Sequence, residues 1–192
     1  MEKIGWVDVV DYESADQNLK GIYDKVRSPG GQLDNLYQGF SLRPHTIKPA
    51  DDLYIAAMHH EDNTLPKVFS ELIGVYVAIL SGCEYARKHH GHNFEHLLGD
   101  EQQAEVILAN LEADQLELCG EAHEVSALRY VKKLCLKPEA VTQEDVAELS
   151  RHQWADGEIL EIVQIVAMFS YFVRVINGVG ISLVGDKVGL YS

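Results

Sequence analysis

The feature of this sequence that most constrains its fold is a helical periodicity that continues almost everywhere after the first dozen residues. Apolar residues recur every three or four positions, which places them on one face of an α-helix. Alternating stretches such as "WVDVV" at residues 6–10 are too short to build a sheet. The sequence therefore predicts an all-α protein.

Capping and helix-breaking residues divide this periodic stretch into helices. We expect helices at about residues 15–27, 33–44, 49–59, 66–80, 83–98, 101–111, 118–137, 143–154 and 157–178. Their predicted N-terminal caps include Ser81, Asp100 and Asp156, and Thr142 with Asp145 three residues later resembles a capping box. The last of these helices is apolar around much of its circumference, so we expect it at the centre of the fold or at a subunit interface.

Length and composition are those of one globular domain that spans residues 1–192. Within it we expect a motif region at about 64–98 and a second helical half at about 120–185. Residues 41–90 and 137–181 share a rhythm of a short helix, a capped turn and a long apolar helix. This rhythm is compatible with two related halves, although the sequence holds no strict internal repeat.

Charge and cysteine usage narrow the classes of partner and compartment. The formal net charge of −14 repels phosphate backbones and anionic lipids, so we expect neither a nucleic-acid partner nor a membrane surface. The apolar run from Ile159 to Ile176 is interrupted by Glu161, Gln164 and Arg174, which argues against a membrane span. With three widely spaced cysteines and no signal-peptide pattern at the N-terminus, we expect a cytoplasmic protein.

Several chemistry-bearing side chains fall within residues 71–94, "ELIGVYVAILSGCEYARKHHGHNF". A helix that begins at about Cys83 would place its thiol where free N–H groups and the macrodipole favour a thiolate. Because position 90 lies two turns along the same face, Cys83, Ala86 and His90 share one stripe. Glu71 lies in an apolar run of the preceding helix, where burial would raise its pKa. The stretch thus predicts proton transfer beside a reactive thiol.

The spacing of Glu71, Cys83, Ala86 and His90 resembles the signature of the alkylhydroperoxidase D and carboxymuconolactone decarboxylase family. The resemblance is closest to the peroxidase-related branch and covers about residues 30–185. It implies an oligomeric helical bundle of the alkylhydroperoxidase D (AhpD) type, in which two thiols cycle through a disulfide while the Glu and the His relay protons. By this resemblance the protein is an antioxidant oxidoreductase that reduces hydroperoxides and takes electrons from an external thiol.

The chain departs from the family at one critical position. Ala86 stands where the family's second cysteine attacks the hydroperoxide. In a first reading, Cys83 works alone through a sulfenic acid that an external thiol reduces. In a second, Glu71 and His90 perform acid–base chemistry without a thiol, as the decarboxylase branch would allow. In a third, the chain keeps the fold as a non-catalytic binding or assembly module.

Two neighbours of the motif complete the expected site. His89 and Tyr85 are expected to line the substrate pocket, although Tyr85 could also serve only in packing. No cofactor is expected, because "GVGISLVGDKVG" follows a helix rather than a strand and no flavin or haem motif is present.

Other histidines offer a competing interpretation. "HNFEH", from His92 to His96, matches the H-x-x-E-H pattern of inverted zinc proteases, with Glu95 as the base. The sequence offers no clear third ligand, so zinc is the runner-up and no metal is expected. The histidines of "MHH" at residues 58–60 end a helix, where their charge would complement the dipole, and we expect them at the surface.

Overall fold

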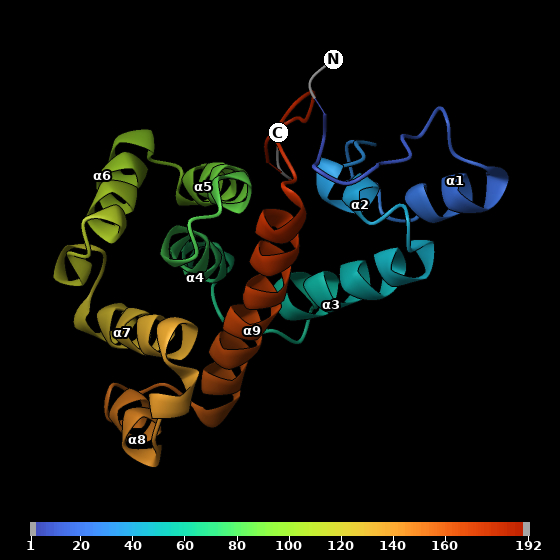
Figure 1. The fold of residues 1–192 in the computed structure, drawn as a ribbon. Coiled ribbons are helices and arrows are strands. Elements are labelled where there is room, and N and C mark those ends of the chain that lie inside the picture. The colour runs from blue at the N-terminus through green and yellow to red at the C-terminus, as the bar shows by residue number, and fades with distance from the viewer. Residues whose placement is uncertain (1–2, 190–192) are drawn as a thin grey trace.

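The computed structural model describes residues 3–189, and within them every regular element is helical (Figure 1). The α-helices are α1 Gln17–Tyr23, α2 Asn35–Gly39, α3 Ile47–His59, α4 Lys67–Leu80, α5 Glu84–Leu98, α6 Glu101–Glu112, α7 Ala122–Leu136, α8 Gln143–Arg151 and α9 Asp156–Val179. Short 3₁₀ turns lie at Pro44–Thr46, Leu116–Leu118 and Pro138–Ala140. The predicted all-α fold is confirmed.

Helix α4 forms the centre of the core, and all of its residues from 69 to 78 are buried. Helix α5 lies alongside α4, and α9 packs against α3, α4 and α7. A Cβ atom added to Gly74 of α4 would lie 2.2 Å from the ring of Phe169 on α9, so a glycine is needed where these two helices meet. This close approach carries the Phe169 ring toward the helix pair α4 and α5.

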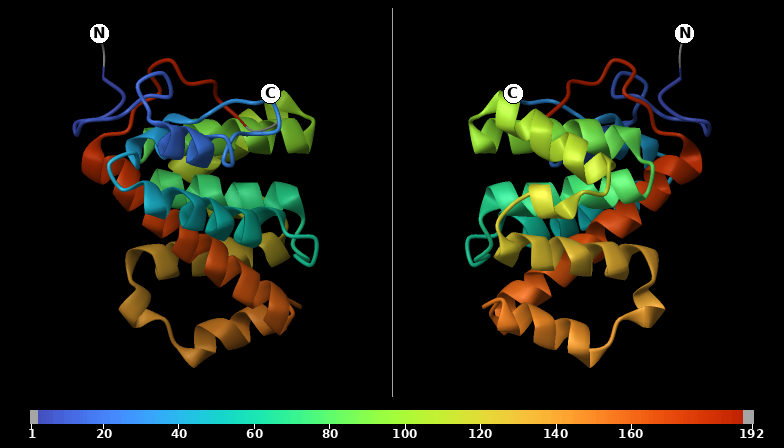
Figure 2. Two further views of the ribbon diagram at one scale, coloured as in Figure 1. Left: turned by 90° about the vertical axis from the view of Figure 1, so that its right-hand side faces the viewer. Right: turned by 90° about the vertical axis from the view of Figure 1, so that its left-hand side faces the viewer.

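Helix α9 crosses the stack of helices diagonally and begins beside α8 (Figure 2). Its central position confirms one of the two predicted placements. It is also the one helix among residues 3–189 that is long and apolar enough to cross a membrane. Half of its most apolar stretch of 18 residues is buried inside the protein. A core helix of a soluble protein has the same length and composition, so this observation leaves the prediction of no membrane untested.

Two predicted helix starts are confirmed in detail. The carboxylate of Asp100 accepts a hydrogen bond from the backbone N–H of Gln103 at the start of α6, at 2.9 Å. At the start of α8, the backbone N–H of Thr142 donates to the Asp145 carboxylate at 2.7 Å. Both contacts satisfy N–H groups that have no partner inside their helix.

Other predicted helix ends are wrong by a few residues. Helix α1 is shorter than the predicted range of 15–27. Ser81 ends α4 rather than capping α5, because its N–H bonds back to the carbonyl of Val77, and Cys83 takes the N-cap position of α5. Asp156 is the first residue of α9 rather than its cap. Ala155 holds the cap position, and its backbone N–H donates a hydrogen bond to the carboxylate of Glu158.

Candidate functional site

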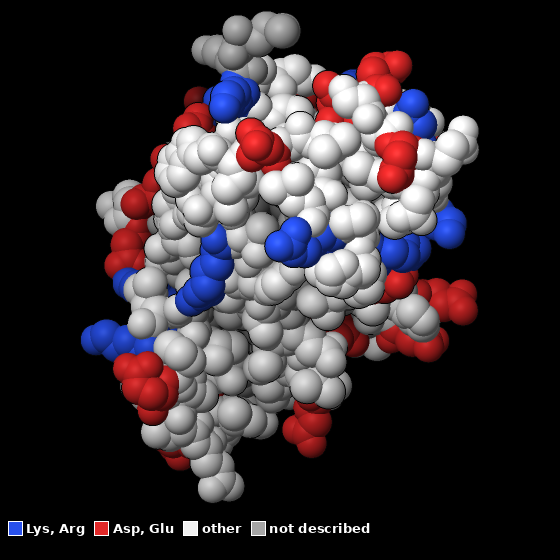
Figure 3. Space-filling model, turned by 45° about the vertical axis from the view of Figure 1, so that its right-hand side comes forward, with Lys and Arg blue, Asp and Glu red and all other residues white. Residues whose placement is uncertain are grey.

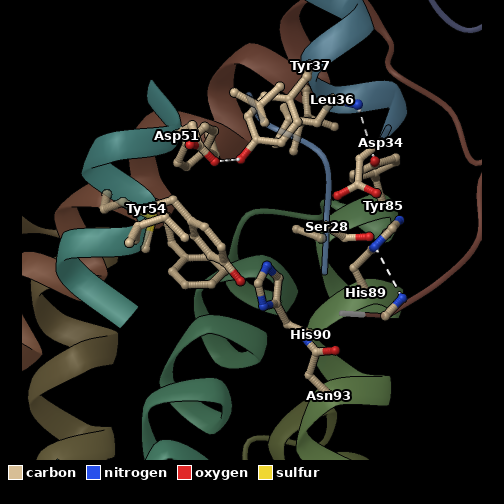
Figure 4. Close-up of a pocket in the computed structure, with 18 of the residues that line it drawn as sticks. Ser28, Asp34, Leu36, Tyr37, Asp51, Tyr54, Tyr85, His89, His90 and Asn93 are labelled. Carbon is tan, nitrogen blue, oxygen red and sulfur yellow. Dashed lines mark hydrogen bonds between the residues drawn. The ribbon is translucent and has the colours of Figure 1, made fainter. Parts of the chain in front are cut away.

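A cavity of about 120 Å³ lies between α2, α3, α5 and α9 (Figure 4). Helix α9 supplies an apolar wall, formed by Met168, Phe169, Phe172 and Ile176. The facing walls carry polar side chains, which include Asp34, Tyr37, Asp51, Tyr54, Tyr85, His89, His90 and Asn93. Apolar walls with a few convergent polar groups are typical of small-molecule sites.

His90 lines this cavity and pairs with Glu71, which belongs to α4 and is not among the lining residues. The Glu71 carboxylate, on a residue that is 1% exposed, lies with Oε2 2.7 Å from Nδ1 of His90. Its Oε1 accepts a hydrogen bond from the side chain of Asn93 at 3.3 Å. A carboxylate at Nδ1 favours the tautomer that carries its hydrogen there, which leaves Nε2 of His90 able to accept a proton. The structure therefore brings these two predicted residues together.

Aromatic rings enclose His90. The ring of Phe169 meets it edge to face with 4.5 Å between centroids, and Tyr54 lies at 6.1 Å. Figure 4 shows the hydroxyl end of Tyr54 directed toward the His90 ring. Such surroundings exclude water and strengthen electrostatic interactions within the cavity.

His59 lies behind Tyr54, with 5.0 Å between the two ring centroids. It is half-buried, its Nε2 atom is buried without a hydrogen-bond partner, and burial lowers its pKa. The predicted surface role is therefore wrong for His59, although His60 is exposed as expected. The helix end at these residues packs over α4 instead of projecting into solvent, which the local sequence pattern does not reveal.

Cys83 does not lie where the sequence predicted. The residue is 1% exposed and is not among those that line the cavity. Burial raises the pKa of its thiol, despite the opposing effect of the backbone N–H groups of Ala86 and Tyr85. The expected thiolate at an exposed helix start is wrong, because the α4–α5 connection packs its sulfur into the core and desolvation outweighs the helix dipole. Ala86 lines the cavity instead.

The three cysteines form no disulfide in the structure. Cys83, Cys119 and Cys135 are all free thiols in the structure. The Cys135 sulfur lies 4.0 Å from the hydroxyl of Ser81, and burial raises the pKa of both Cys119 and Cys135. No disulfide replaces the one that Ala86 removes from the family's pattern.

The predicted pocket residues Tyr85 and His89 do line the cavity, and their rings stack at 4.5 Å. Their polar atoms converge on Asp186, which sequence analysis missed. The Tyr85 hydroxyl donates to Oδ2 of Asp186 at 2.6 Å, as does the backbone N–H of Asn35 at 3.0 Å. Nε2 of His89 lies 3.5 Å from the same oxygen, but it makes no hydrogen bond there. The C-terminal segment thus closes one side of the site.

Asp186 and Asp34 are neighbouring carboxyl groups in opposite electrostatic situations. Burial opposes the ionisation of Asp186, yet the nearby His89 ring and the hydrogen bonds from Tyr85 and Asn35 hold its pKa below the ordinary value. Burial raises the pKa of Asp34 to about 6, and the Asp186 charge adds to this rise. No spacing signal in the sequence relates the two residues, which are brought together only by the fold of the C-terminal segment.

The zinc alternative finds no support in the arrangement of side chains. Among residues 3–189, no three His, Cys, Asp or Glu side chains come together in a metal-binding geometry. A Cβ atom at Gly189 would lie 2.2 Å from the ring of His92, so the C-terminal segment packs directly over one of the two proposed ligands.

Comparisons with known proteins identify the fold. No protein-family model matches the chain, and no match is found among curated proteins. A structure of a peroxidase-related protein from Ralstonia eutropha, described as an alkylhydroperoxidase AhpD core, is similar with a TM-score of 0.81 and 19% identity, covering 98% of this chain and 100% of that one. A peroxidase-related protein from Silicibacter gives 0.80 and 19%, covering 94% and 92%.

The debrominase Bmp8 is also similar, with a TM-score of 0.69 and 17% identity over 93% of this chain and 90% of that one. A cysteine-to-alanine variant of it has been solved in complex with 2,3,4-tribromopyrrole. At these identities the similarity shows a shared AhpD-like fold.

Proposed function

We propose that this protein is an enzyme that transfers protons on a small, ring-sized organic substrate, with His90 as general base and acid and Glu71 as its buried partner. The carrying observation is the 2.7 Å contact between these residues at a cavity that the Cys83 thiol does not line. The proposal corresponds to the thiol-independent acid–base interpretation of the sequence.

The geometry suggests how the pair would work. Glu71 holds the His90 ring in one tautomer, so Nε2 can take a proton from the substrate. The imidazolium that forms is stabilised by the buried carboxylate, which would otherwise be an uncompensated charge inside α4. In a second step the imidazolium donates its proton from Nε2 to another atom of the substrate, which restores the neutral His90 ring.

The cavity volume limits the size of the substrate. An engineered cavity of about 150 Å³ with apolar walls holds one benzene molecule, and the cavity here has a volume of about 120 Å³. The rings of Phe169 and Phe172 offer flat surfaces to a planar molecule. The tribromopyrrole in the similar fold of the debrominase variant is likewise a single ring, which supports a substrate of this size.

Hydroperoxide reduction through Cys83 with an external thiol stays a prediction. The burial of Cys83 limits access to its sulfur, and the raised pKa of its thiol reduces the fraction of reactive thiolate. The antioxidant role, the cytoplasmic location and the oligomeric state likewise remain proposals based on the sequence.

One set of variants separates the two chemistries. Proton transfer is measured by NMR as deuterium exchange at the carbon beside the carbonyl of cyclopentanone, and peroxidase activity with an organic hydroperoxide and a thiol. We expect Cys83→Ser to retain exchange, and His90→Gln to lose it by about a hundredfold. Turnover of hydroperoxide by the wild type that Cys83→Ser abolishes, with no exchange in either protein, would support the thiol reaction instead.

A further inference from the structure

The cavity presents two unlike surfaces to a bound molecule. The side chains of α9 form its apolar wall, whereas Asp34, Ser28 and His89 lie on the opposite side (Figure 4). A molecule that fills this space would lay its hydrocarbon part on α9 and turn a polar group toward Asp34. The identity of that polar group follows from the hydrogen bonds already made there.

Asp34 has an acceptor atom to spare. Its Oδ1 accepts a hydrogen bond from the side chain of Gln32 at 3.3 Å, and no residue from 3 to 189 donates to its Oδ2. The nearby donors are already directed elsewhere. The hydroxyl of Tyr85 donates to Asp186, and Nε2 of His89 faces the same carboxylate. This oxygen is therefore open to accept a hydrogen bond, and a ligand that supplies a donor gains from meeting it.

The charges around the cavity disfavour an anionic ligand. Arg27 lines it, but its guanidinium group donates to Asp24 and to the carbonyl of Gly31. Asp51 also lines the cavity, but its carboxylate accepts a hydrogen bond from the Tyr37 hydroxyl at 2.8 Å and forms an ion pair with Lys48 at 3.3 Å. Of the two aspartates that line the cavity within the described residues, Asp34 is therefore the one with an oxygen open to accept a hydrogen bond, and its charge is negative.

The two histidines of the cavity do not reverse this balance. His90 is paired with Glu71, and His89 faces Asp186. Each imidazole thus has its own carboxylate, which would neutralise any positive charge on the ring. A carboxylate on a substrate would find no unpaired cation in this part of the structure and would lie beside Asp34.

We propose that Asp34 anchors the substrate of this site by accepting a hydrogen bond from its hydroxyl group, so that the cavity takes an uncharged hydroxylated ring and rejects ring carboxylates. This inference rests on the proposed function for the position of the reacting atoms, but its test measures binding alone. Asp34 is on this account a specificity-determining residue rather than a member of the proton-transferring pair.

Ligand-observed NMR titrations with phenol and benzoate at pH 8 test the proposal. For the wild type we expect phenol to bind at least tenfold more tightly than benzoate. Asp34→Asn keeps the side-chain volume and removes the charge, so the preference should shrink at least tenfold, partly through a gain in benzoate affinity. A gain of binding cannot result from unfolding. Asp62→Asn is the control, and it should leave the preference unchanged because Asp62 is exposed and does not line the cavity.

Three outcomes would overturn the anchoring role: equal binding of phenol and benzoate by the wild type, an unchanged preference in Asp34→Asn, or no binding of either ring. The His90→Gln variant separates this binding result from the proposed function, because it should lose exchange activity and keep the preference for phenol. Phenol binding with an Asp34-dependent preference, in a protein without exchange activity, would leave the anchor in place and refute the proton-transfer reaction. Exchange activity without that preference would do the reverse.

Discussion

The carboxylate of Glu71 lies 2.7 Å from Nδ1 of His90, although the two residues belong to different helices. Glu71 is a buried residue of α4, and the His90 ring that contacts it lines the cavity. This contact ties the packing of α4 against α5 to the chemistry proposed for the site. The predictions below test that chemistry and the packing that supports it.

Glu71→Gln should reduce the rate of proton transfer about a hundredfold. The amide cannot stabilise an imidazolium as a carboxylate does, and it can present a donor to Nδ1 that selects the wrong tautomer. The measurement is the deuterium exchange of cyclopentanone followed by NMR. Glu84→Gln, which removes an exposed carboxylate at the start of α5, should exchange as fast as the wild type. Equal rates for all three proteins would remove Glu71 from the mechanism.

The Cys83 thiol should resist alkylation in the folded protein. Burial both blocks the reagent and raises the pKa of the thiol, so little thiolate is available at pH 8. Mass spectrometry after timed exposure to iodoacetamide should show modification of the half-buried Cys135 first, and of Cys83 only when urea unfolds the chain. Rapid labelling of Cys83 in the folded protein, or its oxidation by a low concentration of peroxide, would support hydroperoxide reduction through this thiol.

Asp34→Asn should stabilise the protein at pH 8 by about 1 kcal/mol and have less effect at pH 4. Burial and the charge of Asp186 raise the pKa of Asp34 to about 6, while His89, His90 and Gln32 act in the opposite direction. The folded state therefore binds more protons than the unfolded state between about pH 4 and 6, and its stability falls as the pH rises through this range.

Urea unfolding at the two pH values measures this effect. The exposed Asp62 provides the control, since Asp62→Asn should change the free energy of unfolding little at either pH. A loss of stability in Asp34→Asn at pH 8 would show that the Asp34 charge is stabilised by the site rather than tolerated by it.

Gly74→Ala should destabilise the fold by about 1–3 kcal/mol. The added methyl group would meet the Phe169 ring at 2.2 Å, and relief requires that α9 or the ring wall of the cavity shifts. Gly157→Ala is the control, because nothing lies within 4 Å of its added Cβ atom. Urea unfolding at pH 7 measures both, and equal stabilities would mean that the α4–α9 contact is looser than the structure shows.

The expected homo-oligomer should depend on α3 and α9. These helices carry the exposed apolar side chains Leu53, Ile55, Leu160 and Tyr171, and Figure 3 shows broad uncharged areas on this side of the molecule. Leu160→Lys combined with Tyr171→Lys should shift the mass measured by light scattering toward that of a single chain. The substitution Val106→Lys, at an exposed apolar residue of α6, is the control. A wild type that is itself monomeric contradicts the prediction.

The family resemblance, rather than a local pattern, implied the pairing of Glu71 with His90. The sequence by itself determined the helical class and most helix positions. Each of these follows from local rules, because periodicity, caps and the spacing along a helix depend on neighbours within a few residues. The Asp100 and Thr142 starts were predictable for that reason, since each cap lies three residues from its partner.

Only the tertiary structure decided which atoms cover each face of a helix. Cys83 has the same local surroundings whether its sulfur meets solvent or the core, and the packing of α4 against α5 placed it in the core. Asp34 and Asp186 are far apart along the chain, and the return of the C-terminal segment brought Asp186 near Asp34, which lines the cavity. Burial and pKa depend on such long-range contacts because they are set by the atoms that replace water, and a local pattern does not specify those atoms.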